Sequence, residues 1–384
     1  MSDNFTEITH SSWGGRILGS IGGMFIGVIL AIVAVPLLFW NEGRTIKTTR
    51  ALEEASANFA VVSPESVQPA HEGKLVYVSG PAETSEVLHD PIYGISANAL
   101  ILSRTAEMYQ WEQKESSHKE KNLGGSEDTV TTYSYVKGWH AEHIDSSQFK
   151  HPEGHLNPTS SSAVNSTFTA GQAHLGAFSL PGALLGQLSA DEPLPLGEKD
   201  LAKLPASIRG NAHLSGTEIY IGRDPATEQI GDVRVSFKTL SPGVVSLIAQ
   251  QTGKTFAPYV AKSGKTVERI EKGPVSAAEM FAHAKSENRV IAWIVRGGGF
   301  FIMFLGFTLV TRPVSVLGDI IPFIGSLIEA GAAFFGFAAA LLVSSVTVAV
   351  AWFAYRPLLS GSLVAAALLV WYLLHRAHRK PVGA

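Results

Sequence analysis

Two long apolar stretches constrain this chain more than any other feature of its sequence. Residues 17–40 contain no charged side chain, and apolar residues dominate again over 290–374. A helix that spans a bilayer needs roughly 20 consecutive apolar residues. Only 16% of the 384 residues are charged, against about 25% in soluble proteins. The chain is therefore expected to be an integral membrane protein.

The first stretch is expected to be an uncleaved anchor. Its apolar run exceeds the roughly 7–15 residues of a signal-peptide core, and no A-x-A cleavage site follows it. The C-terminal region is divided by Arg312-Pro313 and Arg356-Pro357, and Asp319 and Pro322 interrupt a short amphipathic piece that we interpret as interfacial or re-entrant. The expected layout is a tail at 1–16, spans at 17–40, 290–310, 328–355 and 358–374, the interfacial piece at 314–327, and a basic tail at 375–384.

The fold class that follows is an α+β membrane protein with four transmembrane helices, arranged one plus three around residues 41–289. Strand patterns at 75–78, 100–115, 129–140, 217–221 and 233–237 predict a mostly β extramembrane domain, with a hairpin loop at 116–128. Helical patterns occur at 45–59, 243–250 and 277–289. The first is expected to continue the anchor helix, and the last leads into the second span.

The side of the membrane on which each part lies is less strongly determined by the sequence. Basic residues flank both ends of the spans, and long domains translocate largely regardless of their charge. We expect both termini in the cytosol and residues 41–289 on the non-cytosolic side.

Few features of the sequence point to catalysis. The absence of cysteine excludes disulfides and thiolate chemistry, and no nucleophile-elbow, zinc-protease or phosphate-loop motif is present. The pairs His140/His143 and His151/His155 leave open a metal-dependent enzyme in the 140–155 loop, but solvated loop histidines are favoured. We expect no enzyme activity, catalytic residue, cofactor or metal, and the net charge of −3 gives no reason to expect nucleic acid binding.

Charged residues within the apolar regions are the stronger functional candidates. A bare charge at membrane depth costs at least about 2.5 kcal/mol, so Arg296, Asp319 and Glu329 require an explanation. Snorkelling of Arg296, its pairing with Asp319 or Glu329, and a conducting path all remain open. Candidates for helix packing are Gly19, Gly23 and Gly27, which follow small-residue spacing, although glycine is generally frequent in membrane helices.

Short motifs in the same order along nearly the whole chain resemble those of the transmembrane protein 43 family, also called LUMA. They include Asn41-Glu42-Gly43-Arg44, Glu107-Met108-Tyr109 with Trp111, Asn157-Pro158, and Tyr355-Arg356-Pro357. The resemblance implies four spans and a large non-cytosolic domain. It supplies no catalytic residues.

Animal members of that family lie in the endoplasmic reticulum and inner nuclear membrane, where they organise membrane protein complexes, self-associate and bind emerin and lamins. Bacterial members also exist. The resemblance implies a bacterial inner membrane protein with a periplasmic domain or, in a eukaryote, an endoplasmic reticulum or inner nuclear membrane protein with a lumenal domain. Expected partners are the lipid bilayer, further copies and other membrane proteins, with emerin and lamins only for a eukaryotic member. The leading hypothesis is a non-enzymatic organiser of membrane complexes, and the main alternative is a channel or transporter.

Overall fold

The computed structural model describes residues 4–159, 163–357, 360–362 and 369. The chain divides into two compact units. The sheet domain comprises Met1–Glu7, Ala51–His118 and Val130–His283, and the helix unit comprises Ile8–Arg50, Lys119–Thr129 and Ala284–Ala384. The expected mixture of helix and sheet is confirmed.

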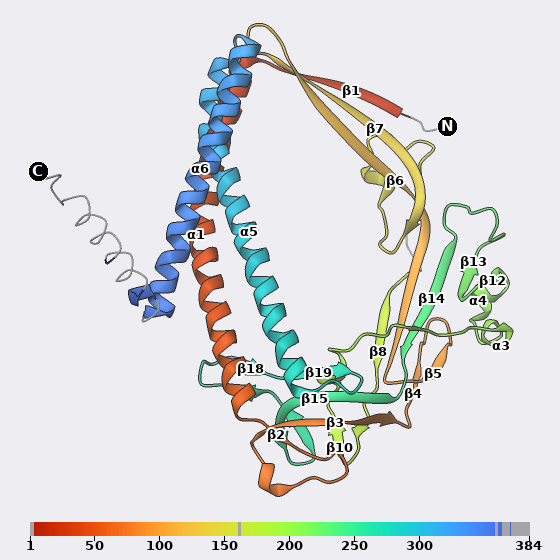
Figure 1. Ribbon diagram of the computed structural model, residues 1–384. Helices are drawn as coiled ribbons and strands as arrows, with labels where there is room; N and C mark the ends of the chain where they lie inside the picture. The colour runs from red at the N-terminus through yellow and green to blue at the C-terminus, as the bar shows by residue number, and fades with distance from the viewer. Residues whose placement is uncertain (1–3, 160–162, 358–359, 363–368, 370–384) are drawn as a thin grey trace, which may run out of the picture. The chain divides into compact units, whose positions relative to one another are not determined.

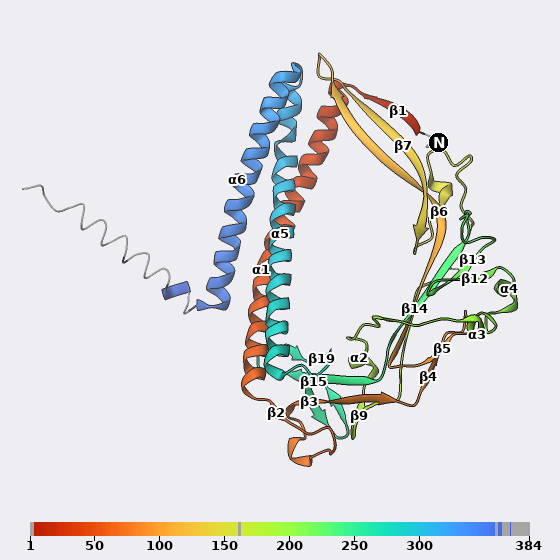
Figure 2. The same ribbon diagram turned by 45° about the vertical axis from the view of Figure 1, so that its right-hand side comes forward.

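Three long helices run side by side in the helix unit (Figures 1 and 2). They are α1 (Trp13–Ala57), α5 (Ala277–Gly318) and α6 (Pro322–Tyr355). Each is long and apolar enough to cross a membrane. Their shared core contains Ala34, Leu38, Met303 and Ala340, all almost fully buried. The predicted fourth span at 358–374 and the tail at 375–384 lie outside the described residues, apart from 360–362 and 369.

The helices are longer than the predicted spans. As expected, α1 continues into the predicted 45–59 helix, where it ends at Ala57, and α5 begins at Ala277, the start of the predicted 277–289 helix. The prediction that 314–327 forms a separate segment is wrong, because α5 continues through Pro313 to Gly318 and α6 begins at Pro322. Proline inside a helix costs about 3 kcal/mol. The helix nevertheless continues for five residues beyond Pro313.

The strands form two large sheets and two strand pairs in the described part of the chain. One sheet has the order β1-β7-β6-β14-β13-β12, with β8 on β6 and β11 on β14. The other has the order β10-β9-β3-β15-β16, with β19 on β15 and β2 on β3. The separate pairs are β4 with β5 and β17 with β18.

The first sheet contains β1 (Asn4–Ser11), β6 (Ile101–Lys121), β7 (Glu127–His140), β8 (Ser166–Thr169), β11 (Glu192–Pro193), β12 (Ala212–Ser215), β13 (Glu218–Ile221) and β14 (Val233–Leu240). The second contains β2 (Ala60–Val61), β3 (Leu75–Thr84), β9 (Ala173–Leu175), β10 (Phe178–Leu180), β15 (Gly243–Thr252), β16 (Thr255–Ala257) and β19 (Arg269–Lys272). The remaining elements are β4 (Val87–His89), β5 (Ser96–Asn98), β17 (Tyr259–Val260), β18 (Thr266–Val267), η1 (Pro69–His71), η2 (Ser146–Gln148), α2 (Gly182–Leu185), α3 (Glu198–Leu201) and α4 (Ala206–Arg209).

Both large sheets contribute to one hydrophobic core in the sheet domain. Its members include Val78 from β3, Leu247 from β15, Leu102 from β6 and Phe237 from β14, each at most 1% exposed. The predicted strands at 75–78, 217–221 and 233–237 correspond to β3, β13 and β14. The prediction of a helix at 243–250 is wrong, because this segment is the interior strand β15. Five consecutive buried residues from Val245 to Ala249 remove the alternation by which a half-exposed strand is recognised.

The predicted hairpin is confirmed, but its strands extend into the predicted loop. Only residues 122–126 remain as the turn between β6 and β7. Gly124 and Gly125 both have positive φ, at 89° and 83°, which a glycine adopts without steric penalty. Lys119 on β6 faces Glu127 on β7, with 2.8 Å between Nζ and Oε1.

Candidate functional site

Two clusters of charged residues join the elements of the helix unit. The first centres on Glu42 in α1. This glutamate is only 1% exposed. Arg296 of α5 donates from Nε to Oε1 at 2.6 Å and from Nη2 to Oε2 at 2.8 Å, and Trp352 of α6 donates from Nε1 to Oε2 at 2.8 Å. Glu42 therefore connects all three helices. Its two-pronged pair with the guanidinium of Arg296 is of the kind that forms the strongest hydrogen bonds in proteins.

Residues on either side of Glu42 continue this junction. Asn41 donates from Nδ2 to the carbonyl oxygen of Ala292 at 3.1 Å, and Arg44 donates from Nη1 to Oδ1 of Asn288 at 3.2 Å. Asn288 in turn donates to the carbonyl oxygen of Thr45.

Gly43 completes the junction by allowing a close approach. A Cβ at Gly43 would lie 2.5 Å from a ring carbon of Tyr355. The Asn41–Arg44 motif and Tyr355 are therefore parts of one helix–helix junction. The amide of Arg356 donates to the carbonyl oxygen of Trp352 where α6 ends, and Pro357 follows.

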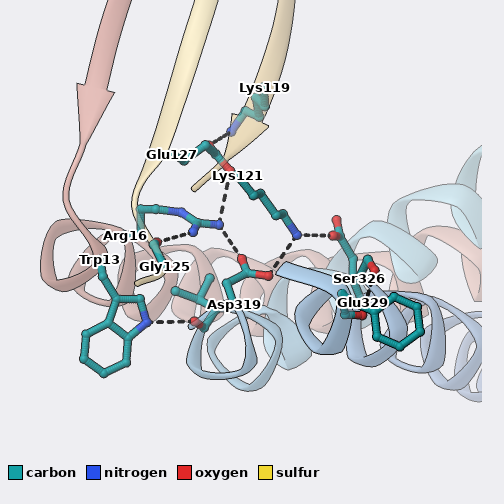
Figure 3. A network of polar contacts seen from close by, with 11 residues as sticks. Trp13, Arg16, Lys119, Lys121, Gly125, Glu127, Asp319, Ser326 and Glu329 are labelled. Carbon is teal, nitrogen blue, oxygen red and sulfur yellow. Dashed lines mark hydrogen bonds and ion pairs between the residues drawn. The ribbon is translucent and has the colours of Figure 1, made fainter. Parts of the chain in front are cut away.

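The second cluster lies where α1 begins, at the turn between α5 and α6 (Figure 3). Asp319, whose side chain is 1% exposed, accepts from Arg16 Nη2 at 2.5 Å and from Lys121 Nζ at 3.0 Å. Lys121 also contacts Glu329 at 2.7 Å, and Arg16 contacts Glu127 at 3.1 Å. The tip of the β6–β7 hairpin is thereby bound to α1, to α6 and to the turn between α5 and α6.

Backbone contacts reinforce the second cluster. The indole of Trp13 donates to the carbonyl oxygen of Val316 at 3.0 Å, and the amide of Gly124 donates to the carbonyl oxygen of Ile320 at 3.1 Å. Partial burial alone would lower the pKa of Lys121, but its bonds to Glu329 and Asp319 outweigh this effect and raise the pKa. The ammonium of Lys121 is therefore the favoured form at neutral pH.

Of the three candidate packing glycines, Gly27 makes the closest approach. A Cβ there would lie 2.5 Å from the carbonyl oxygen of Gly306 and 2.9 Å from Leu309 Cβ. At Gly23 the nearest atom, on Leu309, is 3.8 Å away, and at Gly19 nothing lies within 4 Å. Of the three candidates, Gly27 is therefore the one at which α1 packs closely on α5.

Of the alternatives left open for Arg296, pairing with Asp319 or Glu329 does not occur in the structure. Arg296 pairs with Glu42, while Asp319 and Glu329 share Lys121. The sequence reasoning overlooked Glu42 as a partner because it stands just beyond the first apolar stretch, where a charge needs no special explanation.

Other motif residues pack within the sheet domain. Glu107 accepts from Arg234 at 2.6 Å, Met108 is buried in the core, and the Tyr109 ring lies 5.2 Å from that of Trp139. These contacts give the motif a structural role on β6.

Asn157 bridges Trp111 by accepting from its amide at 2.7 Å and donating to its carbonyl oxygen at 3.0 Å. Pro158, the next motif residue, lies close to Gly231: a Cβ there would be 3.2 Å from Pro158 Cγ.

The loop histidines pack against aromatic rings. His155 is 3% exposed and stacks on Tyr135 at 4.0 Å, and His151 stacks on Phe5 at 4.2 Å. No group of three or more potential metal-ligating residues occurs within the described ranges.

Long apolar helices joined by buried ion pairs, together with the sheet domain, define an integral membrane protein with a large, sheet-rich domain. The family model for Transmembrane protein 43 matches residues 108–357. Transmembrane protein 43 of Rattus norvegicus is 35% identical over 367 residues, covering 92% of this chain and 90% of the relative. The human protein of that name is 34% identical over 374 residues, covering 94% of this chain and 91% of the relative.

A more distant relative, the Transmembrane protein 43 homolog of Drosophila melanogaster, is 27% identical over 364 residues and covers 90% of this chain and 93% of the relative. The chain therefore belongs to the transmembrane protein 43 family. No solved structure matches it.

Proposed function

We propose that this chain is a non-enzymatic integral membrane protein that organises membrane protein complexes through self-association and partner binding. The observation that carries the proposal is that the charged residues in and beside the apolar helices form ion pairs that join structural elements. Glu42 joins three helices, and Asp319 joins the start of α1 to the hairpin tip. Such ion pairs favour a rigid framework of helices, as a scaffold in the membrane requires.

The same geometry does not favour the channel or transporter alternative. Arg296 and Asp319 are 23 positions apart in the sequence, which corresponds to about 34 Å of helix at 1.5 Å per residue. The core between the two clusters contains Leu38, Met303 and Ala340. The charged residues therefore form two separate junctions, and no described polar path links them.

Crosslinking in native membranes, followed by affinity purification, tests the scaffold proposal. The expected result is a reproducible oligomer or a defined set of co-purified membrane proteins. Recovery of only uncrosslinked monomer, with no enriched partner, would refute it. Reconstituted liposomes test the alternative, because ion or solute flux that is lost in Asp319→Asn would favour a transport function.

The proposed cytosolic termini and non-cytosolic domain need a separate test. That topology places residues 1–16 and 41–289 on opposite sides of the membrane, whereas the second cluster joins Arg16 to the hairpin tip. The natural chain has no cysteine, so single cysteines at His10, Leu123 and Lys254 can be labelled with an impermeant maleimide. If the cysteine of Leu123→Cys is labelled from the same side as that of His10→Cys, the second cluster also forms in the membrane. If it is labelled from the same side as that of Lys254→Cys, the entire domain is translocated.

A further inference from the structure

A cavity of about 450 Å³ opens beside the second charged cluster. Four basic residues and three acidic residues line it, together with apolar and hydroxyl side chains of α5 and α6. The basic residues are Arg16, Lys119, Lys121 and Arg312, and the acidic residues are Glu127, Asp319 and Glu329.

Each carboxylate at this cavity is already paired. Glu127 accepts from Arg16 and Lys119, Asp319 accepts from Arg16 and Lys121, and Glu329 accepts from Lys121. The charges that remain favour an anionic ligand over a cation.

Arg312 is the basic residue at this cavity with no ion pair among the described residues, and it is exposed. Ser315 lies three positions further along α5, on the same face of the helix. Its hydroxyl also lines the cavity and forms no hydrogen bond with the described part of the chain. A guanidinium and a hydroxyl at this spacing suit the oxygens of a phosphate group.

The wall of the cavity changes from charged to apolar along α5. Leu309 and Leu305 precede Arg312 by three and seven positions and line the same cavity, with Ala332 of α6 beside them. Seven helical residues cover about 10 Å. The apolar wall lies within the candidate spanning helix, where an acyl chain is the natural neighbour.

From this arrangement we propose that the cavity binds an acidic glycerophospholipid. Its phosphate contacts Arg312 and Ser315, and the start of an acyl chain lies along Leu309 and Leu305. Basic pockets between membrane helices are suited to acidic head groups. The apolar wall distinguishes this site from one for a free phosphate, which would gain nothing from the leucines.

Native mass spectrometry of the full chain in mild detergent tests the proposal. Phosphatidylglycerol and phosphatidylcholine with identical acyl chains are added in equal amounts, and the ratio of the bound lipids is measured. One charge near a membrane surface contributes about 1 kcal/mol. Arg312→Gln is therefore expected to reduce the preference for phosphatidylglycerol about fivefold.

Arg289→Gln is the matched control, because Arg289 is an exposed residue of the same helix outside this cavity. Its lipid preference should equal that of the natural chain. Arg312→Gln removes no ion pair, so both variants should unfold at the natural temperature. Equal lipid preference in the two variants would overturn the proposal. The proposal would also be overturned if soluble glycerol phosphate displaced the lipid at the same concentration as the lipid, since this would show that the acyl chain contributes nothing to binding.

Discussion

The Glu42–Arg296 pair allows the sharpest test of how the helix unit is held together. Glu42→Leu leaves the guanidinium of Arg296 without its carboxylate, in a side chain that is only 21% exposed. Breaking a buried ion pair by removing one partner typically costs about 3–5 kcal/mol. Both carboxylate oxygens are used here, and Trp352 loses its acceptor as well. We therefore expect a loss of about 4 kcal/mol.

The free energy of unfolding should be measured in detergent as a double-mutant cycle with Arg296→Met. Each single variant should be strongly destabilised, and the double variant should be less destabilised than either, because no unpaired charge remains buried. At about 2–4 °C per kcal/mol for a unit of this size, the single variants should melt on the order of 10 °C lower. Additive losses, or a loss below about 1 kcal/mol for Glu42→Leu, would refute the reasoning.

Three further predictions follow from single contacts. Gly27→Ala should lower the melting temperature measurably, since its Cβ would meet a carbonyl oxygen of α5 at 2.5 Å, whereas Gly19→Ala should have no such effect. The pKa of Lys121 is higher in the folded protein than in the unfolded chain. The pairing of Lys121 with Asp319 therefore stabilises the hairpin tip fully at any pH below the unfolded pKa, and this stabilisation is lost as the pH rises through the folded pKa. Proteolysis at the tip should therefore increase in strongly alkaline buffer, and an unchanged rate would count against the pair. Asp90→Asn should destabilise the sheet domain by about 3–5 kcal/mol, measured by denaturant unfolding, because the carboxylate is fully buried against an arginine.

The sequence predicted the elements whose pattern is local. Residues 17–40 have a composition that only a buried or lipid-facing helix tolerates, and the Thr- and Tyr-rich strand at 129–140 alternates as half-exposed strands do. Prediction failed for 243–250, because an interior strand and a buried helix both appear as continuous apolar runs. It also failed at Pro313, because a proline weakens a helix locally without preventing its continuation, and α5 extends five residues beyond it.

The partners in the candidate site could not be predicted for a different reason. Glu42 and Arg296 are 254 positions apart, and their pairing depends on how α1 and α5 align. The sequence pointed to Arg296 because of its surroundings, but Asp319 and Glu329 were closer along the chain and equally acidic. The alignment in which Gly27 contacts Gly306 is also the one that brings Glu42 opposite Arg296.

That register also explains why two charged clusters can coexist with an apolar helix interior. Close contacts of Gly27 with Gly306 and of Leu38 with Gly299 fix α1 against α5 within the apolar stretch. The charged residues that flank the apolar stretch of α1, Arg16 and Glu42, then meet Asp319 in the turn after α5 and Arg296 in α5. A slip of one helical turn along α1 would separate both pairs at once and leave buried charges at each end. Because that penalty arises at two distant sites together, the ion pairs select one alignment of the helices even where each contributes little net stability.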